Sequence, residues 1–297
     1  MNFGLFCLMT QRDASQSIAK LYDDNLQLVK LAEDVGFDGF GNLVLRRTVA
    51  SWRASEMKAI AGAFYRELEQ RYERRLWYPM PLIEVFPTAQ EAGIWQMRMK
   101  DPEMARMIEA GPSTDPAAED IPMPYGCGIV PRCAWLDVQE LLAVHATRWK
   151  AADALEHRRI GDAEVRTTAE GVEVEGRSAP RLVWCTGAFN TLPGLVAVRG
   201  EGLTVRIPGL RLKSVLHRGL FIVPVGEERF RVGATFAWSA VWNGATEEGR
   251  HWLTDRLERA VNRPFEVEEH WCGVRPASSD RRPIIGGLHG RGHVLNV

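Results

Sequence analysis

A series of five short apolar segments in the second half of the chain limits the possible fold more than any other feature. Each segment is bounded by polar or turn-forming residues, which is the pattern that predicts a β-strand. The expected strands are Gly171–Glu175, Arg181–Cys185, Leu203–Ile207, Leu220–Val225 and Phe230–Ala234. This part of the chain is therefore expected to form a mixed, mostly antiparallel sheet.

The first part of the chain has a different pattern, in which strands alternate with helices. The apolar run Phe3–Met9 predicts a buried strand, and leucines at helical spacing then predict a helix that Gly36 ends. Further helices are expected from Ser51 through Leu68, over Asp137–Trp149 and over Thr246–Val261, with Thr246 as the N-cap. The combination predicts an α/β (α+β) fold, with one α/β layer joined to one mixed sheet.

Two segments between these elements have a distinctive composition. Trp77–Phe86 is strand-like, and its prolines Pro79 and Pro81 predict an edge position, because proline cannot donate to a sheet hydrogen bond. Residues 109–128 are rich in proline, glycine and acidic residues, and predict a long surface loop.

Composition excludes several classes of function. The formal net charge is -1, so no overall electrostatic field favours nucleic acid or an anionic membrane. No apolar run is long enough to cross a bilayer, and the N-terminal residues lack the basic region and cleavage site of a signal peptide. The 5 cysteines are scattered without a C-x-x-C pair, which indicates reduced thiols and a cytoplasmic location. His289 and His293 lie in a glycine-rich loop rather than on one helix face, so no metal site is expected.

The most specific motif is WCGVRPASSDRRPIIG, residues 271–286. It resembles the carboxy-terminal signature of the FAD-dependent D-amino-acid oxidase and glycine oxidase family, in which a strand ends in G-x-R-P and leads to a P-x-I-G turn. The resemblance implies that Arg275 binds the substrate's carboxylate, a role that suits a planar two-pronged donor held by Pro276. The alternative is that Arg275 forms a structural ion pair with Asp280 or another acid.

A second motif is the strand-to-turn passage RLVWCTGA, residues 181–188. The family has the same passage beside its FAD, and a glycine there lets the cofactor approach the backbone. The resemblance therefore implies that a set of residues from both motifs contacts FAD: Cys185, Thr186, Gly187, Ala188, Gly273, Pro276 and Gly286.

Three further segments, 51–69, 198–207 and 230–238, resemble the family in the same order along the chain. Together they imply an incomplete FAD-binding dinucleotide fold with a substrate-domain sheet. Residues 41–75, 130–192 and 270–297 are expected to form a partial FAD-binding layer, and residues 76–129 and 193–269 the substrate-binding layer.

Both ends of the chain depart from the family pattern. The family begins with a G-x-G-x-x-G turn that holds the cofactor's pyrophosphate at a helix N-terminus, and no such turn follows a predicted strand here. Residues 1–40 instead resemble the first β–α unit of luciferase-like flavin monooxygenases, through the F-G-L-F opening and the L-A-E-D-V-G-F-D ending. We expect this unit to dock where the missing dinucleotide unit belonged. The chain stops at HVLNV, where the family continues, so we also expect a short C-terminus.

These observations leave two hypotheses. The first is an FAD enzyme that oxidises a C–N bond of an amino acid or amine by hydride transfer to the flavin, with a small-molecule substrate and no nucleic-acid or membrane partner. The second is a non-catalytic remnant or chimera of such an enzyme, which cannot retain FAD. The sequence does not give the substrate, the electron acceptor or the oligomeric state.

Overall fold

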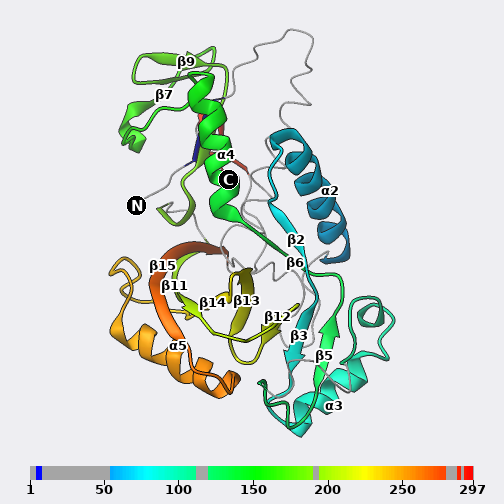
Figure 1. The fold of residues 1–297 in the computed structure, drawn as a ribbon. Coiled ribbons are helices and arrows are strands. Elements are labelled where there is room, and N and C mark those ends of the chain that lie inside the picture. Colours follow the sequence, from blue (N-terminus) through cyan, green and yellow to red (C-terminus); the bar gives the residue numbers. More distant parts are fainter. Residues whose placement is uncertain are drawn as a thin grey trace. The chain divides into compact units, whose positions relative to one another are not determined.

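The fold comes from a computed structural model, which describes residues 5–8, 54–111, 120–189, 194–278, 286–288 and 291–296. The described residues form two compact units (Figure 1). The first unit takes residues from Met1–Phe37, Leu141–Ala197 and Arg275–Val297, and the second takes residues from Asp38–Glu140 and Val198–Val274. The expected helix before Gly36 lies outside the described residues.

The second unit is built on an eight-stranded sheet in the order β15-β11-β14-β13-β12-β3-β5-β4. The strands are β3 (Leu82–Val85), β4 (Glu109–Ala110), β5 (Cys127–Val130), β11 (Leu195–Arg206), β12 (Val215–His217), β13 (Phe221–Gly226), β14 (Arg229–Gly233) and β15 (Glu266–Ser278). The neighbouring strands β11 and β14, β14 and β13, and β13 and β12 pair antiparallel, as do β3 with β5 and β5 with β4. Strand β12 pairs parallel with β3. The expected mixed, mostly antiparallel sheet is confirmed.

Helix α5 (Glu247–Ala260) covers one face of this sheet beside β11 and β14 (Figure 1). It begins where predicted, because the Thr246 hydroxyl accepts a hydrogen bond from the Gly249 N–H at 3.1 Å. Leu253 and Leu257 of α5 are fully buried, and Leu203 and Ile222 are among the sheet residues of the same apolar cluster. Burying each such side chain stabilises the fold by about 1.5–3 kcal/mol, so this face is the main core of the second unit.

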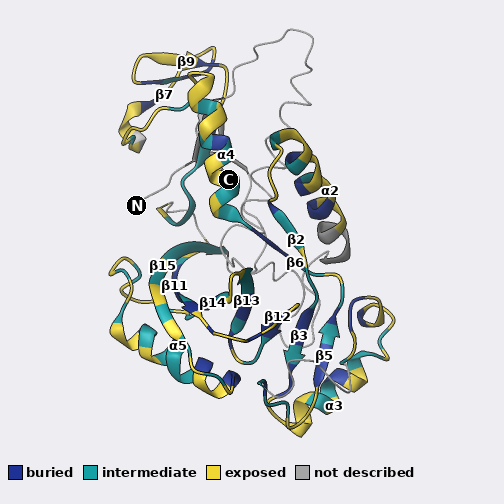
Figure 2. Cartoon of the chain, in the orientation of Figure 1, coloured by how far each residue is buried: buried dark blue, intermediate teal, exposed yellow. Residues whose placement is uncertain are grey.

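A second apolar cluster involves α3 (Ala89–Arg98) and strands β3, β5, β12 and β13 (Figure 2). Its central side chain is Trp95, which is buried and donates its indole N–H to the Glu109 carbonyl at 3.0 Å. The indole lies where a side chain at Gly128 would project: a Cβ there would come within 2.1 Å of the ring. The region 109–128 is thus not entirely a surface loop, since it contains β4, the start of β5 and the fully buried Ile121.

Helix α2 (Ala54–Tyr72) confirms the helix expected from Ser51, although residues 51–53 lie outside the described ones. The prediction of an edge strand over Trp77–Phe86 is wrong for its second half. The segment divides into β2 (Trp77–Pro79), which pairs with β6 (Ala134–Leu136), and β3, which lies inside the large sheet between β12 and β5. Pro81 stands between the two strands, and its carbonyl accepts from the Val215 N–H at 2.9 Å, so the prolines mark a break rather than an edge.

The first unit contains a four-stranded sheet in the order β1-β10-β17-β16. These strands are β1 (Leu5–Leu8), β10 (Leu182–Cys185), β16 (Gly286–Leu288) and β17 (Arg291–Asn296). The unit also has helix α4 (Val138–Ala151, from Leu141 onward) and a three-stranded sheet of β7 (Val165–Thr167), β8 (Val172–Val174) and β9 (Arg177–Ala179). Strand β1 runs antiparallel to β10, whereas β17 runs parallel to it.

Short 3-10 turns complete the described chain: η1 (Met104–Arg106), η2 (Asp162–Glu164) and η3 (Gly187–Phe189). No helix within the described ranges is both long and apolar enough to span a bilayer.

Candidate functional site

The passage predicted to contact a cofactor is the end of β10. The strand ends at Cys185, and Gly187–Phe189 follows as η3, closed by a hydrogen bond from the Phe189 N–H to the Thr186 carbonyl at 3.1 Å. Gly187 has a φ of 53°, in the left-handed region that favours glycine, and among the described residues no heavy atom beyond Gly187 and its chain neighbours lies within 4 Å of where its Cβ would stand. The backbone at Gly187 is therefore open to the close approach of another group.

The Thr186 side chain adds a polar atom to this passage. Its hydroxyl oxygen is buried, and none of the described residues forms a hydrogen bond with it. Buried hydroxyl groups in proteins nearly always have a partner, so one left unpaired needs an explanation such as a ligand or a water molecule. Thr186 is thus available to a group that lies against the end of β10.

The second predicted segment is the end of β15, which carries Gly273, Arg275 and Pro276. All three residues are half-buried, and within the described part of the chain no heavy atom other than those of Gly273 and its chain neighbours lies within 4 Å of where a Cβ at Gly273 would stand. Alternate residues of a strand project to the same side, so Arg275 shares a side of β15 with Gly273. Gly286 begins β16, opposite Asn296 of β17.

The residues of the predicted site are divided between the two compact units. Arg275 and Pro276 belong to the same compact unit as the Cys185–Ala188 passage, and Gly273 belongs to the other. Asp280, the alternative partner of Arg275, lies outside the described residues. That the Arg275 guanidinium faces a pocket beside the Cys185–Ala188 turn therefore stays a prediction.

A buried polar cluster in the second unit was missed by the sequence analysis. Its centre is Glu201 of β11, whose side chain is only 2% exposed. The Glu201 carboxylate accepts from the Thr246 hydroxyl at 2.8 Å, the Thr246 N–H at 2.8 Å and the His270 Nε2–H at 3.0 Å. Arg199 Nε lies 3.3 Å from Glu201 Oε1. This distance allows an ion pair, but the contact does not have the geometry of a hydrogen bond.

This polar cluster of Arg199, Glu201, Thr246 and His270 connects β11, β15 and the start of α5. Arg199 also donates to the Ala240 carbonyl at 2.9 Å, which fixes the segment between β14 and α5. That segment carries three exposed aromatic side chains, Phe236, Trp238 and Trp242. One signal in the sequence could have revealed the cluster: strand alternation puts Arg199 and Glu201 on the same side as the core residues Leu203 and Val205.

A hydrogen-bonded pair of polar side chains lies on strands β3 and β12. The His217 Nδ1–H donates to both carboxylate oxygens of Glu84 at 2.8 Å, and the imidazole packs against the Phe221 ring with centroids 4.5 Å apart. Within the described ranges, no group of three or more His, Cys, Asp and Glu residues could hold a metal ion.

Comparison with solved structures identifies the class of fold. A glycine oxidase from Geobacillus kaustophilus superposes with a TM-score of 0.73 at 19% identity, over 89% of this chain and 78% of that one. Iminodiacetate oxidase from Chelativorans sp. BNC1 superposes with a TM-score of 0.67 at 17% identity, over 87% of this chain and 78% of that one. The fold is therefore the one that these two oxidases share.

Sequence comparison then gives the family. The family model DAO, FAD dependent oxidoreductase, matches residues 14–297, and the chain belongs to this family.

Two curated relatives can be aligned with parts of the chain. Glycine oxidase of Bacillus licheniformis is 27% identical over 156 residues, 47% of this chain and 41% of that protein. The bifunctional protein ThiO/ThiG of Nostoc sp. is 34% identical over 121 residues, 37% of this chain and 19% of that protein. The chain thus spans less than half the length of these relatives.

The residues at the end of β10 fit the cofactor of this family. A buried, unpaired threonine hydroxyl beside a glycine with a left-handed backbone and open space is suited to a close contact with a polar ligand such as FAD. The glycine-rich turn that would hold the pyrophosphate is absent from the sequence. FAD is the family's cofactor, and that Thr186 and Gly187 contact it stays a prediction.

Proposed function

We propose that this chain binds FAD and oxidises a C–N bond of an amino acid or amine, with Arg275 holding the substrate's carboxylate. The observation that carries the proposal is the G-V-R-P segment of β15, in which Arg275 is half-buried in a strand and followed by Pro276. The ring of Pro276 restricts the backbone directly after the arginine. A guanidinium held by this restricted backbone can form two parallel hydrogen bonds to one carboxylate. The two bonds orient the substrate as well as bind it.

The roles of the remaining residues follow from their positions. FAD, when bound, would supply the acceptor for the hydride that leaves the substrate's α-carbon. Thr186 would offer its buried hydroxyl to the cofactor, and Gly187 would let the cofactor approach the backbone without meeting a side chain. Arg275 would neutralise the substrate's carboxylate and hold it in one orientation, which is how this chain would contribute to the rate.

Replacing Arg275 with lysine tests the proposal. The Arg275→Lys change keeps the positive charge but removes the two-pronged geometry, so we expect carboxylate binding to weaken by about 1–3 kcal/mol, the size of a charge-assisted hydrogen bond. The measurement is a titration of both proteins with glycolate or benzoate. Equal affinity of the two proteins would remove the basis for an amino-acid substrate.

A second function is favoured by one specific observation. The sequence has no G-x-G-x-x-G turn, which favours a non-catalytic member of the family that fails to retain FAD. Losing two charge-assisted bonds of the pyrophosphate cradle would weaken FAD binding by roughly a hundredfold or more. The absorbance spectrum of the purified protein, titrated with FAD, distinguishes the two: stoichiometric flavin supports the enzyme, and no binding supports the non-catalytic form.

A further inference from the structure

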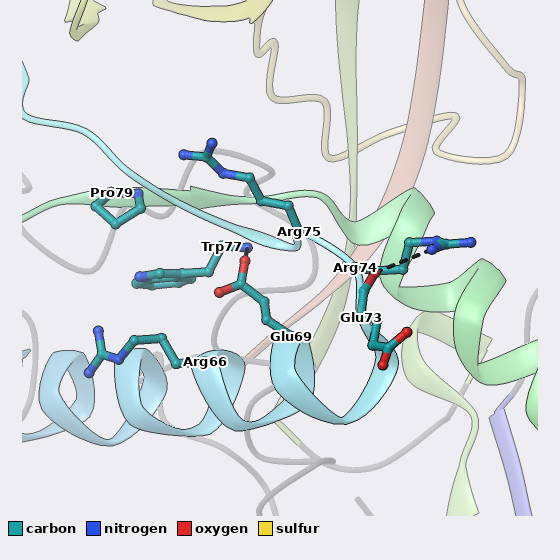
Figure 3. Close-up of a pocket in the computed structure, with 7 residues that line it drawn as sticks. All are labelled: Arg66, Glu69, Glu73, Arg74, Arg75, Trp77 and Pro79. Carbon is teal, nitrogen blue, oxygen red and sulfur yellow. Dashed lines mark hydrogen bonds between the residues drawn. The ribbon is translucent and has the colours of Figure 1, made fainter.

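Two exposed aromatic side chains follow β14 in the second unit. Phe236 is 53% exposed and Trp238 is 64% exposed, although both are large apolar groups. Trp77 shows the more usual arrangement: its indole lies over α2 (Figure 3) and stacks on the buried ring of Tyr65, with centroids 5.2 Å apart. Large apolar side chains that are exposed together are typical of a surface that binds another molecule.

The backbone directs Phe236 and Trp238 to one face of the sheet. Arg199 of β11 and Ala237 exchange two backbone hydrogen bonds of 2.9 Å, so their side chains share a face. That face is the one toward α5, because Arg199 pairs with Glu201, which accepts hydrogen bonds at the start of that helix. Successive residues of a strand alternate in direction. Phe236 and Trp238, on either side of Ala237, therefore project to the face away from α5.

The same face of β11 and β15 contains two glycines. Gly202 projects away from α5, because it alternates with Glu201. The Trp271 indole of β15 lies over it, since a Cβ at Gly202 would come within 2.3 Å of that ring. Gly273 shares the side of Trp271, and the described residues other than its chain neighbours leave the space within 4 Å of its Cβ position open. Arg275 is the next residue on this side of β15.

We propose that this face selects a substrate with an aromatic group, and that Phe236, Trp238 and Trp271 contact that group. The inference rests on the proposed function, in which Arg275, two residues beyond Gly273 on the same strand, holds the substrate's carboxylate. The aromatic rings offer stacking and edge contacts to a flat group, and Gly273 leaves room for it. The substrate class is thus an amino acid or amine that carries an aromatic ring.

The segment that carries Phe236 and Trp238 is held in place by β11. Besides the two backbone bonds between Arg199 and Ala237, the Arg199 guanidinium donates to the Ala240 carbonyl at 2.9 Å. Because the Arg199 side chain is itself buried, this anchor belongs to the core of the unit. The segment is therefore ordered before any ligand arrives, which reduces the entropy lost on binding.

Benzoate and acetate test the proposal, because one carboxylate carries an aromatic ring and the other a methyl group. In calorimetric titrations of the full chain, we expect benzoate to bind at least about tenfold more tightly than acetate. Phe236→Ala and Trp238→Ala should each weaken benzoate binding by about three- to tenfold and leave acetate binding unchanged. Trp238→Phe, which keeps an aromatic ring, should retain most of the affinity for benzoate. Both side chains are more than half exposed, so the substitutions should leave the fold intact.

Tyr125→Ala is the matched control. Tyr125 is also an exposed aromatic residue of the second unit, at 48%, but it precedes β5, which β13, β12 and β3 separate from β14. Its loss should leave both affinities unchanged. Arg275→Lys should weaken benzoate and acetate alike, so failure of the proposed substrate site affects both ligands, whereas failure of the aromatic face removes only the preference for benzoate. The inference is overturned if the wild type binds benzoate no more tightly than acetate, or if Tyr125→Ala loses as much benzoate affinity as Trp238→Ala.

Discussion

The buried carboxylate of Glu201 allows a sharp prediction about stability. Glu201→Gln keeps the shape of the side chain but replaces one carboxylate oxygen by an NH₂ donor. Oε1 faces the Thr246 hydroxyl and Arg199 Nε, and Oε2 faces the Thr246 N–H and His270 Nε2. Either orientation of the amide therefore places a donor against a donor. The substitution also leaves the Arg199 side chain, 8% exposed, without its counter-charge.

The size of the effect follows from this burial. Removing one partner of a buried ion pair costs about 3–5 kcal/mol, because the other charge stays buried and uncompensated. We expect Glu201→Gln to lower the free energy of unfolding by that amount, measured by urea denaturation followed by circular dichroism. Glu258→Gln is the control, since Glu258 is exposed on α5 and its loss should change stability by less than about 0.5 kcal/mol. A loss below about 1 kcal/mol for Glu201→Gln, the value of a surface ion pair, would refute the reasoning.

Two more predictions concern the neighbours of this carboxylate. Gly249→Ala should destabilise the protein by about 1–3 kcal/mol, because the new Cβ would come within 2.2 Å of Glu201 Oε2, and unchanged thermal unfolding would contradict this. Burial and then the Glu201 charge raise the pKa of the Cys272 thiol, so less of it is thiolate at a given pH than in an ordinary cysteine. Alkylation of Cys272, followed by peptide mass spectrometry, should be slower than that of a free thiol at about pH 8 and faster in Glu201→Gln. A rate equal to that of the free thiol in both proteins would show the predicted pKa to be wrong.

The sequence predicted helices α2, α4 and α5 and strands such as β10, β13 and β14, because their signals are local, whereas it did not predict α3. Thr246 caps α5 as expected, and the Asp137 side chain accepts from the Glu140 N–H at the start of α4. Strand β11 was predicted too short, since only Leu203–Ile207 has the apolar pattern of a strand. Its earlier half contains Arg199 and Glu201, whose burial depends on partners far along the chain.

The candidate site could be predicted only in part, for the same reason. The Cys185–Ala188 passage was predicted from its resemblance to a family, and the left-handed backbone of Gly187 is compatible with a close approach there. Nothing local in the sequence indicates that His270 reaches Glu201, or that Trp77 stacks on Tyr65. Such contacts join residues that only the tertiary fold brings together, and they are decided by packing rather than by propensity.

The parallel pairing of β12 with β3 in the large sheet has a consequence for how the chain folds. Strands β11 to β14 are joined by short connections and can pair soon after synthesis, whereas the pairing of β3 with β5 joins residues 42 to 48 positions apart. The β12–β3 pairing instead joins residues 133 positions apart, as in the contact between His217 and Glu84. Pairing of distant segments closes a long loop before any contact compensates for the lost chain entropy, and such steps are slow. We therefore expect the pairing of β12 with β3 to limit the folding rate of the sheet. Pairing among β11 to β14, or between β3 and β5, is expected to be faster.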